Sequence, residues 1–167
     1  SNDHPTPSLD GSCHCGAVRL ILPVAPTEAT SCNCSLRRRT GGIWAYYALG
    51  AVLVQGHPEN TEEYVWGNRT ERHLRCKTCG TFTHWEPLDA KPGDRHGVNL
   101  RNFEPALLLA VRIRHFDGAD TWAFSIEHAP RRSDLIALLS GEAERLSLIH
   151  ISEPTRLRRI SYAVFCL

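Results

Sequence analysis

The sequence predicts a small, mainly β domain that is held together by zinc, and two observations lead to this fold class. Most of the chain consists of short runs rich in β-branched and aromatic residues, which Gly, Pro, Asn or Asp separate from one another. Cysteines before the last few residues occur only in tight pairs, whereas a disulfide framework scatters its cysteines along loops. Helical spacing of apolar residues is confined to one late segment.

The expected strands are four to seven residues long, and turn-forming residues bound each of them. They are Ala17–Leu22, Ile43–Leu49, Ala51–Gln55, Glu63–Trp66, His73–Cys76, Thr81–Trp85, Gly97–Leu100 and Leu107–Ile113. We interpret Asn68, Pro92 with Gly93, and Asp117 with Gly118 as turn chemistry and not as chemistry of catalysis. The late exception is Ser133–Arg145, where apolar residues at helical spacing follow a serine that fits an N-cap, so a short helix is expected.

The paired cysteines predict a metal site. They are Cys13 with Cys15, Cys32 with Cys34, and Cys76 with Cys79. Two thiolates one or two residues apart can hold one tetrahedral Zn²⁺ at about 2.3 Å per sulfur. Gly16 and Gly80 directly follow two of the pairs, where a positive φ lets the chain turn and aim amides at the sulfurs. These two pairs are therefore the expected partners in one zinc site.

The end of the chain, Leu146–Leu167, is interpreted as a tail derived from a sequencing adapter and not as native protein. Leu146–Arg156 and Ile160–Leu167 can be translated from the two parts of a transposase-type adapter, and the residues between them occupy the place of its index. The alternative is a natural basic tail that Pro154 interrupts. A segment of foreign origin carries no information about the fold, so Cys166 is not a candidate metal ligand.

Charge and hydropathy exclude several classes of function. The 167 residues hold 19 Lys+Arg and 18 Asp+Glu, and 16 and 17 remain once the tail is removed, so no general field favours nucleic acid. No apolar run is long enough for a membrane span, and residues 1–10 lack a signal-peptide pattern. The length fits one domain, and free thiolates suit a reducing compartment. We therefore expect one cytoplasmic domain without nucleic-acid or membrane partners, and the oligomeric state stays open.

Five motifs together resemble the glutathione-dependent formaldehyde-activating enzyme (GFA) family, and the resemblance extends from about Leu9 to Phe124. They are Asp10-Gly-Ser-Cys-His-Cys-Gly-Ala-Val-Arg19, Cys32-Asn-Cys-Ser35 with Arg37, Arg38 and Gly41, Arg75-Cys-Lys-Thr-Cys-Gly80, Val98-Asn-Leu-Arg101 and His115-Phe-Asp-Gly118. Any single pair would be a weak signal, whereas the combination in this order is specific.

The resemblance implies an Mss4-like β-sandwich of short antiparallel strands and two zinc ions. By this reading Cys13, Cys15, Cys76 and Cys79 hold a structural zinc. Cys32 and Cys34 belong to the active-site zinc, which would hold the sulfur of glutathione while it adds to formaldehyde. The implied activity is that of a carbon–sulfur lyase of the S-(hydroxymethyl)glutathione synthase type, with glutathione or another small thiol and a small aldehyde as substrates.

The chain departs from the family at one position of that active site. Members read Cys-x-Cys-x-x-Cys, and here the third position is Arg37, which stays protonated and has no lone pair to offer a metal. Two thiolates alone leave a weak or empty second zinc site, and impaired activity is expected. Arg38 and Arg39 could contact the carboxylates of glutathione, or form a solvated basic turn. Of the histidines, His84 is considered as a replacement ligand, although packing is its more common role.

Three functions therefore stay open: a zinc-dependent thiol enzyme, a catalytically inactive zinc-stabilised module that binds a protein partner, and a redox or metal-buffering role for Cys32 and Cys34. The expected organisation is a flexible arm (residues 1–8), a GFA-like zinc-binding domain (residues 9–125), a C-terminal segment with the short helix (residues 126–145) and the adapter-derived tail (residues 146–167). Zinc stoichiometry separates the first two functions, because an enzyme needs two ions and a structural module needs one.

Overall fold

A computed structural model describes residues 8–125 of the chain. The first arm, the expected helix at Ser133–Arg145 and the tail from Leu146 lie outside these residues. The prediction of a mainly β domain is confirmed, because the described part consists of strands in two sheets with three short helical turns. No helix within residues 8–125 is long and apolar enough to cross a membrane.

The smaller sheet has the strand order β1-β2-β5 and is antiparallel throughout. Its strands are β1 (Asp10–Ser12), β2 (Arg19–Ile21) and β5 (Leu53–Gln55). The hairpin between β1 and β2 contains the first cysteine pair, so the smaller sheet positions one half of the predicted zinc site.

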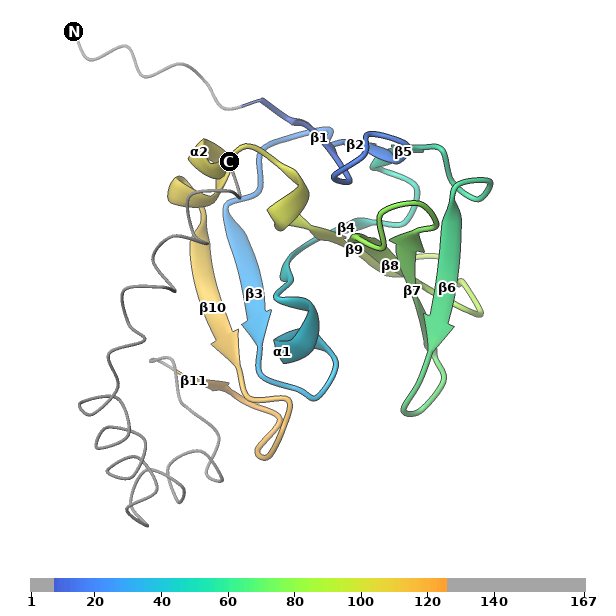
Figure 1. Cartoon of the computed structure of the whole chain (residues 1–167). Coiled ribbons are helices and arrows are strands. Elements are labelled where there is room, and N and C mark those ends of the chain that lie inside the picture. Colours follow the sequence, from blue (N-terminus) through green and yellow to red (C-terminus); the bar gives the residue numbers. More distant parts are fainter. Residues whose placement is uncertain (1–7, 126–167) are drawn as a thin grey trace, which may run out of the picture. The chain divides into compact units, whose positions relative to one another are not determined.

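The larger sheet has the order β11-β10-β3-β4-β9-β8-β7-β6. Its strands are β3 (Glu28–Cys32), β4 (Ile43–Ala48), β6 (Thr61–Val65), β7 (Glu71–Cys76), β8 (Phe82–Pro87), β9 (Arg95–Asn99), β10 (Arg112–Phe116) and β11 (Phe124–Ser125). One pair departs from the expected antiparallel arrangement, because β10 runs parallel to β3, with Phe116 opposite Cys32 (Figure 1). A parallel pair needs a long crossover, and the chain from β4 to α2 supplies it.

The helical elements are α1 (Arg37–Thr40), η1 (Leu100–Asn102) and α2 (Pro105–Leu109). The expected strand at Leu107–Ile113 is wrong over its first residues, which form α2, and β10 begins only at Arg112. Pro105 occupies the first turn of α2, where its missing N–H costs nothing, and the alanine and leucines that follow are good helix formers.

The two faces of the larger sheet have different surroundings. Ala45 and Val98, which pair across β4 and β9, belong to the main core together with Leu20 of the smaller sheet. Because side chains alternate along a strand, Trp44 and Tyr46 face the other way. That second face carries the aromatic side chains that meet Arg37 of α1, so the active-site segment expected from the sequence lies over it.

Candidate metal centre and cysteine pair

Four cysteines from two distant hairpins come together in one cluster, called here the four-cysteine cluster: Cys13, Cys15, Cys76 and Cys79. The first two follow β1, and the other two lie at the end of β7 and in the turn that precedes β8. The cluster thus joins the smaller sheet to the larger one. The sequence predicted this grouping from Gly16 and Gly80, and the structure brings the four sulfurs together.

Distances within the four-cysteine cluster fit one tetrahedral metal ion. One ligand atom from each residue lies within 4.8 Å of the others, and the Cys15 Sγ is 3.7 Å from the Cys13 Sγ and 3.6 Å from the Cys76 Sγ. In a tetrahedron with metal–sulfur bonds of about 2.3 Å, neighbouring sulfurs are about 3.8 Å apart. The spacing is too long for a disulfide and suited to zinc, so the residues present fit the ion that the chemistry implies.

The turn around Cys76 and Cys79 favours thiolates. At Cys15, by contrast, a backbone hydrogen bond at Ala17 is outweighed by desolvation and by hydrogen bonds with the other cysteines, which raise the pKa to about 11. Gly16 and Gly80 adopt φ values of 80° and 73°, and each donates its N–H to the carbonyl of the first cysteine of its pair, at 3.0 and 2.9 Å. The Thr81 hydroxyl and neighbouring amides lower the pKa of Cys79 to about 5. Backbone hydrogen bonds, the first from Cys79, also lower the pKa of Cys76. Thiolate is the form that binds metal, so the local backbone prepares Cys76 and Cys79 for zinc.

The second cysteine site, called here the cysteine pair, consists of Cys32 at the end of β3 and Cys34 just before α1. The Cys34 N–H donates to the Cys32 sulfur at 3.4 Å, and the Arg37 N–H donates to the Cys34 sulfur at 3.5 Å. A hydrogen bond from the Cys32 thiol, with the amides of Arg37 and Leu36 and the Arg37 charge, lowers the pKa of Cys34 to about 6. The same hydrogen bond and burial raise the pKa of Cys32. At neutral pH the pair therefore holds one proton and one negative charge.

Arg37 fills the position where a third thiolate would stand, and aromatic side chains hold its guanidinium. The guanidinium carbon lies 5.2 Å from the Trp44 ring centroid and 6.0 Å from that of Trp85, and Nη1 donates a long hydrogen bond of 3.5 Å to the Tyr46 hydroxyl. Cation–π contacts of this kind stabilise a cation by about 0.5–2 kcal/mol each. Arg37 is thus a packed part of the second sheet face.

Among residues 8–125, no third metal ligand lies beside the cysteine pair. Within residues 8–125, the clusters of three or more His, Cys, Asp or Glu groups do not include Cys32 or Cys34. His84 belongs to another such cluster and, as the neighbour of Trp85 on β8, faces away from Arg37. A catalytic zinc usually has three protein ligands, so the donor set present here does not fit one.

A loop covers the cysteine pair. This covering loop, residues 117–122, is bound by the side chain of Asn33, whose Nδ2 donates to Asp117 Oδ1 at 2.8 Å and whose Oδ1 accepts from the Ala119 N–H at 3.0 Å. The hydrogen bonds from Asn33 and Thr121 lower the pKa of Asp117 to about 2. A Cβ on Gly118 would lie 2.6 Å from the Cys32 sulfur, so only glycine permits this approach.

The interpretation of Asp117 and Gly118 as turn residues missed the hydrogen bond of Asp117 with Asn33 and the approach of Gly118 to the Cys32 sulfur. The motif His115-Phe-Asp-Gly118, which contributed to the resemblance, was the available signal. The two arginines proposed for substrate binding, Arg38 and Arg39, are exposed on α1. Nη1 of Arg39 donates to the Ser35 carbonyl at 2.7 Å, so this side chain lies along its own turn.

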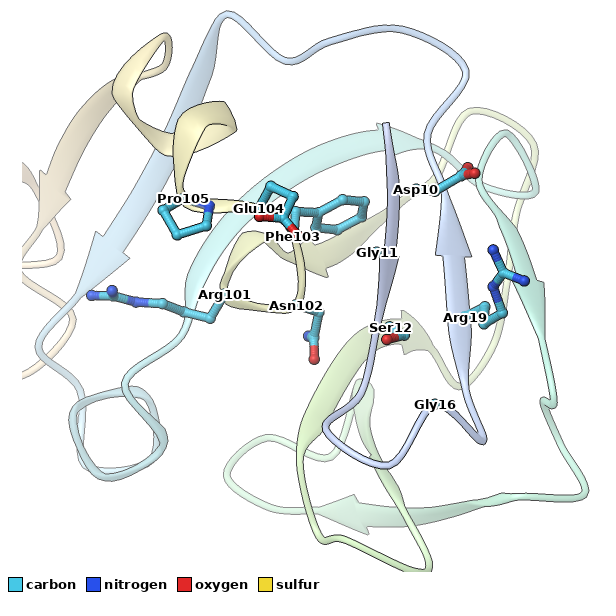
Figure 2. A pocket seen from close by; sticks show the side chains of 10 residues that line it. All are labelled: Asp10, Gly11, Ser12, Gly16, Arg19, Arg101, Asn102, Phe103, Glu104 and Pro105. Atoms are coloured by element: carbon cyan, nitrogen blue, oxygen red, sulfur yellow. The ribbon is translucent and has the colours of Figure 1, made fainter. Parts of the chain in front are cut away.

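A separate cavity of about 510 Å³ lies between the β1–β2 hairpin and the segment 101–105 (Figure 2). Its volume is within the range of small-molecule sites. Gly11 permits the close approach of the two walls, because a Cβ there would lie 2.6 Å from the Asn102 carbonyl oxygen. Cys32 and Cys34 do not line this cavity. Arg101 links the cavity to the segment of the cysteine pair, because it lines the cavity and its Nε donates to the Gly41 carbonyl, directly after α1, at 3.3 Å.

Comparison with known proteins agrees with this description. Residues 8–106 match the family described as "Glutathione-dependent formaldehyde-activating enzyme". Among solved structures, the chain is similar to a crystal structure of a Rhodobacter sphaeroides protein that was a structural genomics target. The two are 35% identical with a TM-score of 0.50, and the match covers 62% of this chain and 98% of that one.

Proposed function

This chain belongs to the glutathione-dependent formaldehyde-activating enzyme family, and we propose that it is a zinc-stabilised carbon–sulfur lyase whose activity Arg37 impairs. The substrates are glutathione or another small thiol and formaldehyde, in a reducing cytoplasm. The observation that carries the proposal is the hydrogen-bonded cysteine pair beside the guanidinium of Arg37, under a loop whose close approach requires the glycine at position 118.

The reaction requires no oxidant. The thiol sulfur forms a bond to the formaldehyde carbon, the π electrons of the carbonyl move to oxygen, and the proton of the thiol ends on that oxygen. In this site the Cys34 thiolate accepts the proton of the substrate thiol, and Cys32, which keeps its proton because its pKa is raised, donates that proton to the developing alkoxide. Transfer of the proton from Cys34 to Cys32 through their hydrogen bond then restores the pair. The Arg37 guanidinium, which helps to lower the pKa of Cys34, also stabilises negative charge on the oxygen. Arg38 on the exposed side of α1 contacts a substrate carboxylate.

The zinc of the four-cysteine cluster supplies structure and takes no part in these steps. A closed Cys₄ site has no open position for a substrate. The cysteine pair offers a metal only two sulfurs, and the Arg37 charge opposes a cation there. The proposed enzyme is therefore slow, because it adds the thiol without a metal-bound thiolate.

Replacement of Arg37 tests the proposal directly. Arg37→Cys restores the family pattern of three cysteines, so we expect bound zinc to rise from about one to about two per chain and the rate of S-(hydroxymethyl)glutathione formation to rise at least tenfold. Lys91→Cys is the matched control, because it adds a thiol and removes a positive charge at an exposed position outside α1 and the covering loop. It should change neither value.

A low rate in the unmodified protein must also disappear when Cys32 and Cys34 are both changed to Ser. If Arg37→Cys gains neither zinc nor activity, the proposed reaction is wrong for this chain. The second candidate function, an inactive module that binds a protein partner, is favoured by one observation: within the described residues the cysteine pair has no third ligand. One zinc per chain and no rate above the uncatalysed reaction in the unmodified protein would support that alternative.

A further inference from the structure

A second group of possible metal ligands lies apart from both cysteine sites. His57, in the loop between β5 and β6, comes together with His84 and Glu86, which lie two residues apart on the same face of β8. One ligand atom from each of the three lies within 4.8 Å of the others. Neither the proposed reaction nor the four-cysteine cluster uses any of them.

The hydrogen bonds of the two imidazoles are compatible with a proton on Nδ1 of each ring. His57 Nδ1 lies 2.6 Å from the Thr61 hydroxyl, and His84 Nδ1 lies 2.9 Å from the Thr83 hydroxyl. Each hydroxyl also has a backbone carbonyl as an acceptor for its proton, of Pro58 and of Leu74 respectively, at 3.3 Å. With the hydroxyl proton on that carbonyl, the hydroxyl oxygen accepts from Nδ1–H, and a neutral ring then has its lone pair on Nε2.

Within the described part of the chain, no hydrogen-bond donor faces the Nε2 atom of His84, a residue that is 1% exposed. His57 Nε2 lies 3.5 Å from Glu86 Oε1, so two acceptors face each other. That separation is longer than a hydrogen bond, yet it fits two ligands on one tetrahedral metal, which are about 3.3 Å apart for bonds of about 2.0–2.1 Å.

Charges around the group favour neutral imidazole. Burial, followed by the charges of His57, His96 and Arg72, lowers the pKa of His84 to about 3. Glu86 is the carboxylate of the group, and Arg72 orients it, because Arg72 Nε donates to Glu86 Oε1 at 2.7 Å. The Arg72 charge opposes a cation, so the affinity should be modest. The side chains of His57 and Glu86 are 21% and 17% exposed, which gives an ion access from solvent.

We propose that His57, His84 and Glu86 form a binding site for a divalent transition-metal ion, with Zn²⁺ as the reference ion. Two imidazoles and one carboxylate suit zinc and its first-row neighbours, whereas calcium and magnesium prefer oxygen ligands alone. The hydroxyls of Thr61 and Thr83 hold the outer nitrogens, as the surroundings of metal-bound histidines usually do. His96 on β9 interacts electrostatically with Glu86 and His84, and within residues 8–125 its buried Nε2 has no hydrogen-bond partner, so it is a candidate for a fourth ligand.

The experiment is calorimetric titration of Zn²⁺ into the full chain whose four-cysteine cluster already holds zinc. Cys32 and Cys34 are changed to Ser in every sample, so that the cysteine pair cannot bind the added ion. One additional ion per chain should bind, and excess zinc should raise the melting temperature. His57→Asn keeps an amide where Nδ1 met Thr61 but removes Nε2, and Glu86→Gln removes the carboxylate. Each should weaken the additional binding at least tenfold.

Glu63→Gln is the matched control, because the Glu63 carboxylate also pairs with Arg72, at 3.4 Å, but is not part of the group. It should leave the additional binding unchanged. Imidazole ¹⁵N NMR of the zinc-loaded protein with intact histidines gives a reading that needs no histidine variant: added zinc should shift the Nε2 signals of His57 and His84. The proposal fails if no additional ion binds, if Glu63→Gln weakens binding as much as Glu86→Gln, or if NMR shows only a proton on His57 Nε2.

Discussion

Removal of the zinc from the four-cysteine cluster should unfold the domain. Cys13 and Cys76 are each 1% exposed, and with Val18 they form the small core where the two sheets meet, so no other layer replaces the metal there. Structural zinc contributes about 10–16 kcal/mol of apparent binding free energy that is also folding free energy. A domain of this size has a total stability of about 5–15 kcal/mol. The loss is therefore of the same size as the whole stability of the domain.

The zinc is removed in two separate experiments, with a strong chelator and by the substitution Cys76→Ser. Far-UV circular dichroism measures the β structure, and elemental analysis measures the bound zinc. Both treatments should abolish the cooperative melting transition. Cys34→Ser is the matched control, because it makes the same chemical change at a half-buried cysteine outside the cluster, and it should melt within about 1 kcal/mol of the unmodified protein. A metal-free protein that keeps its spectrum and melting temperature would refute the reasoning.

Three further predictions concern the cysteine pair and the tail. Cys34 should react with iodoacetamide with a midpoint near pH 6, because its thiolate persists down to its lowered pKa, and Arg37→Gln should move that midpoint upward; an ordinary thiol midpoint above pH 8 would contradict this. Gly118→Ala should displace the covering loop and speed alkylation several-fold, since its Cβ would lie 2.6 Å from the Cys32 sulfur; an unchanged alkylation rate would argue against the close approach. Deletion of residues 146–167 should change the unfolding free energy by less than about 1 kcal/mol in urea titration, and a larger loss would overturn the adapter interpretation.

The sequence was most informative where a residue type has few structural roles, as cysteine does. Paired cysteines with a following glycine have few uses other than metal binding, so the four-cysteine cluster was predictable although 61 positions separate Cys15 from Cys76. The strands were predictable because short runs of β-branched and aromatic residues, bounded by turn residues, are typical of strands. Leu107 was assigned to a strand incorrectly, because a short apolar run fits a buried strand and a buried helix equally well until Pro105 is given weight.

Contacts between distant segments were beyond the sequence. The sequence around Asn33 does not indicate the hydrogen bonds of this residue to the covering loop, because they depend on the parallel pairing of β3 with β10. The environment of Arg37 was likewise hidden: its charge was expected to matter for zinc, but its packing against Trp44 and Trp85 depends on the register of β4, β8 and β9. The group around His57 escaped because its members come from a loop and a strand with no shared motif.

The parallel pairing of β10 with β3 has a consequence for where the working unit ends. The family match covers residues 8–106, yet the strand that flanks Cys32 and the loop that meets its sulfur lie between residues 112 and 122. A protein cut at residue 106 would keep all four residues of the four-cysteine cluster while it left an open sheet edge on β3, and such edges invite pairing with other chains. The smallest unit worth expressing therefore extends at least to Ser125.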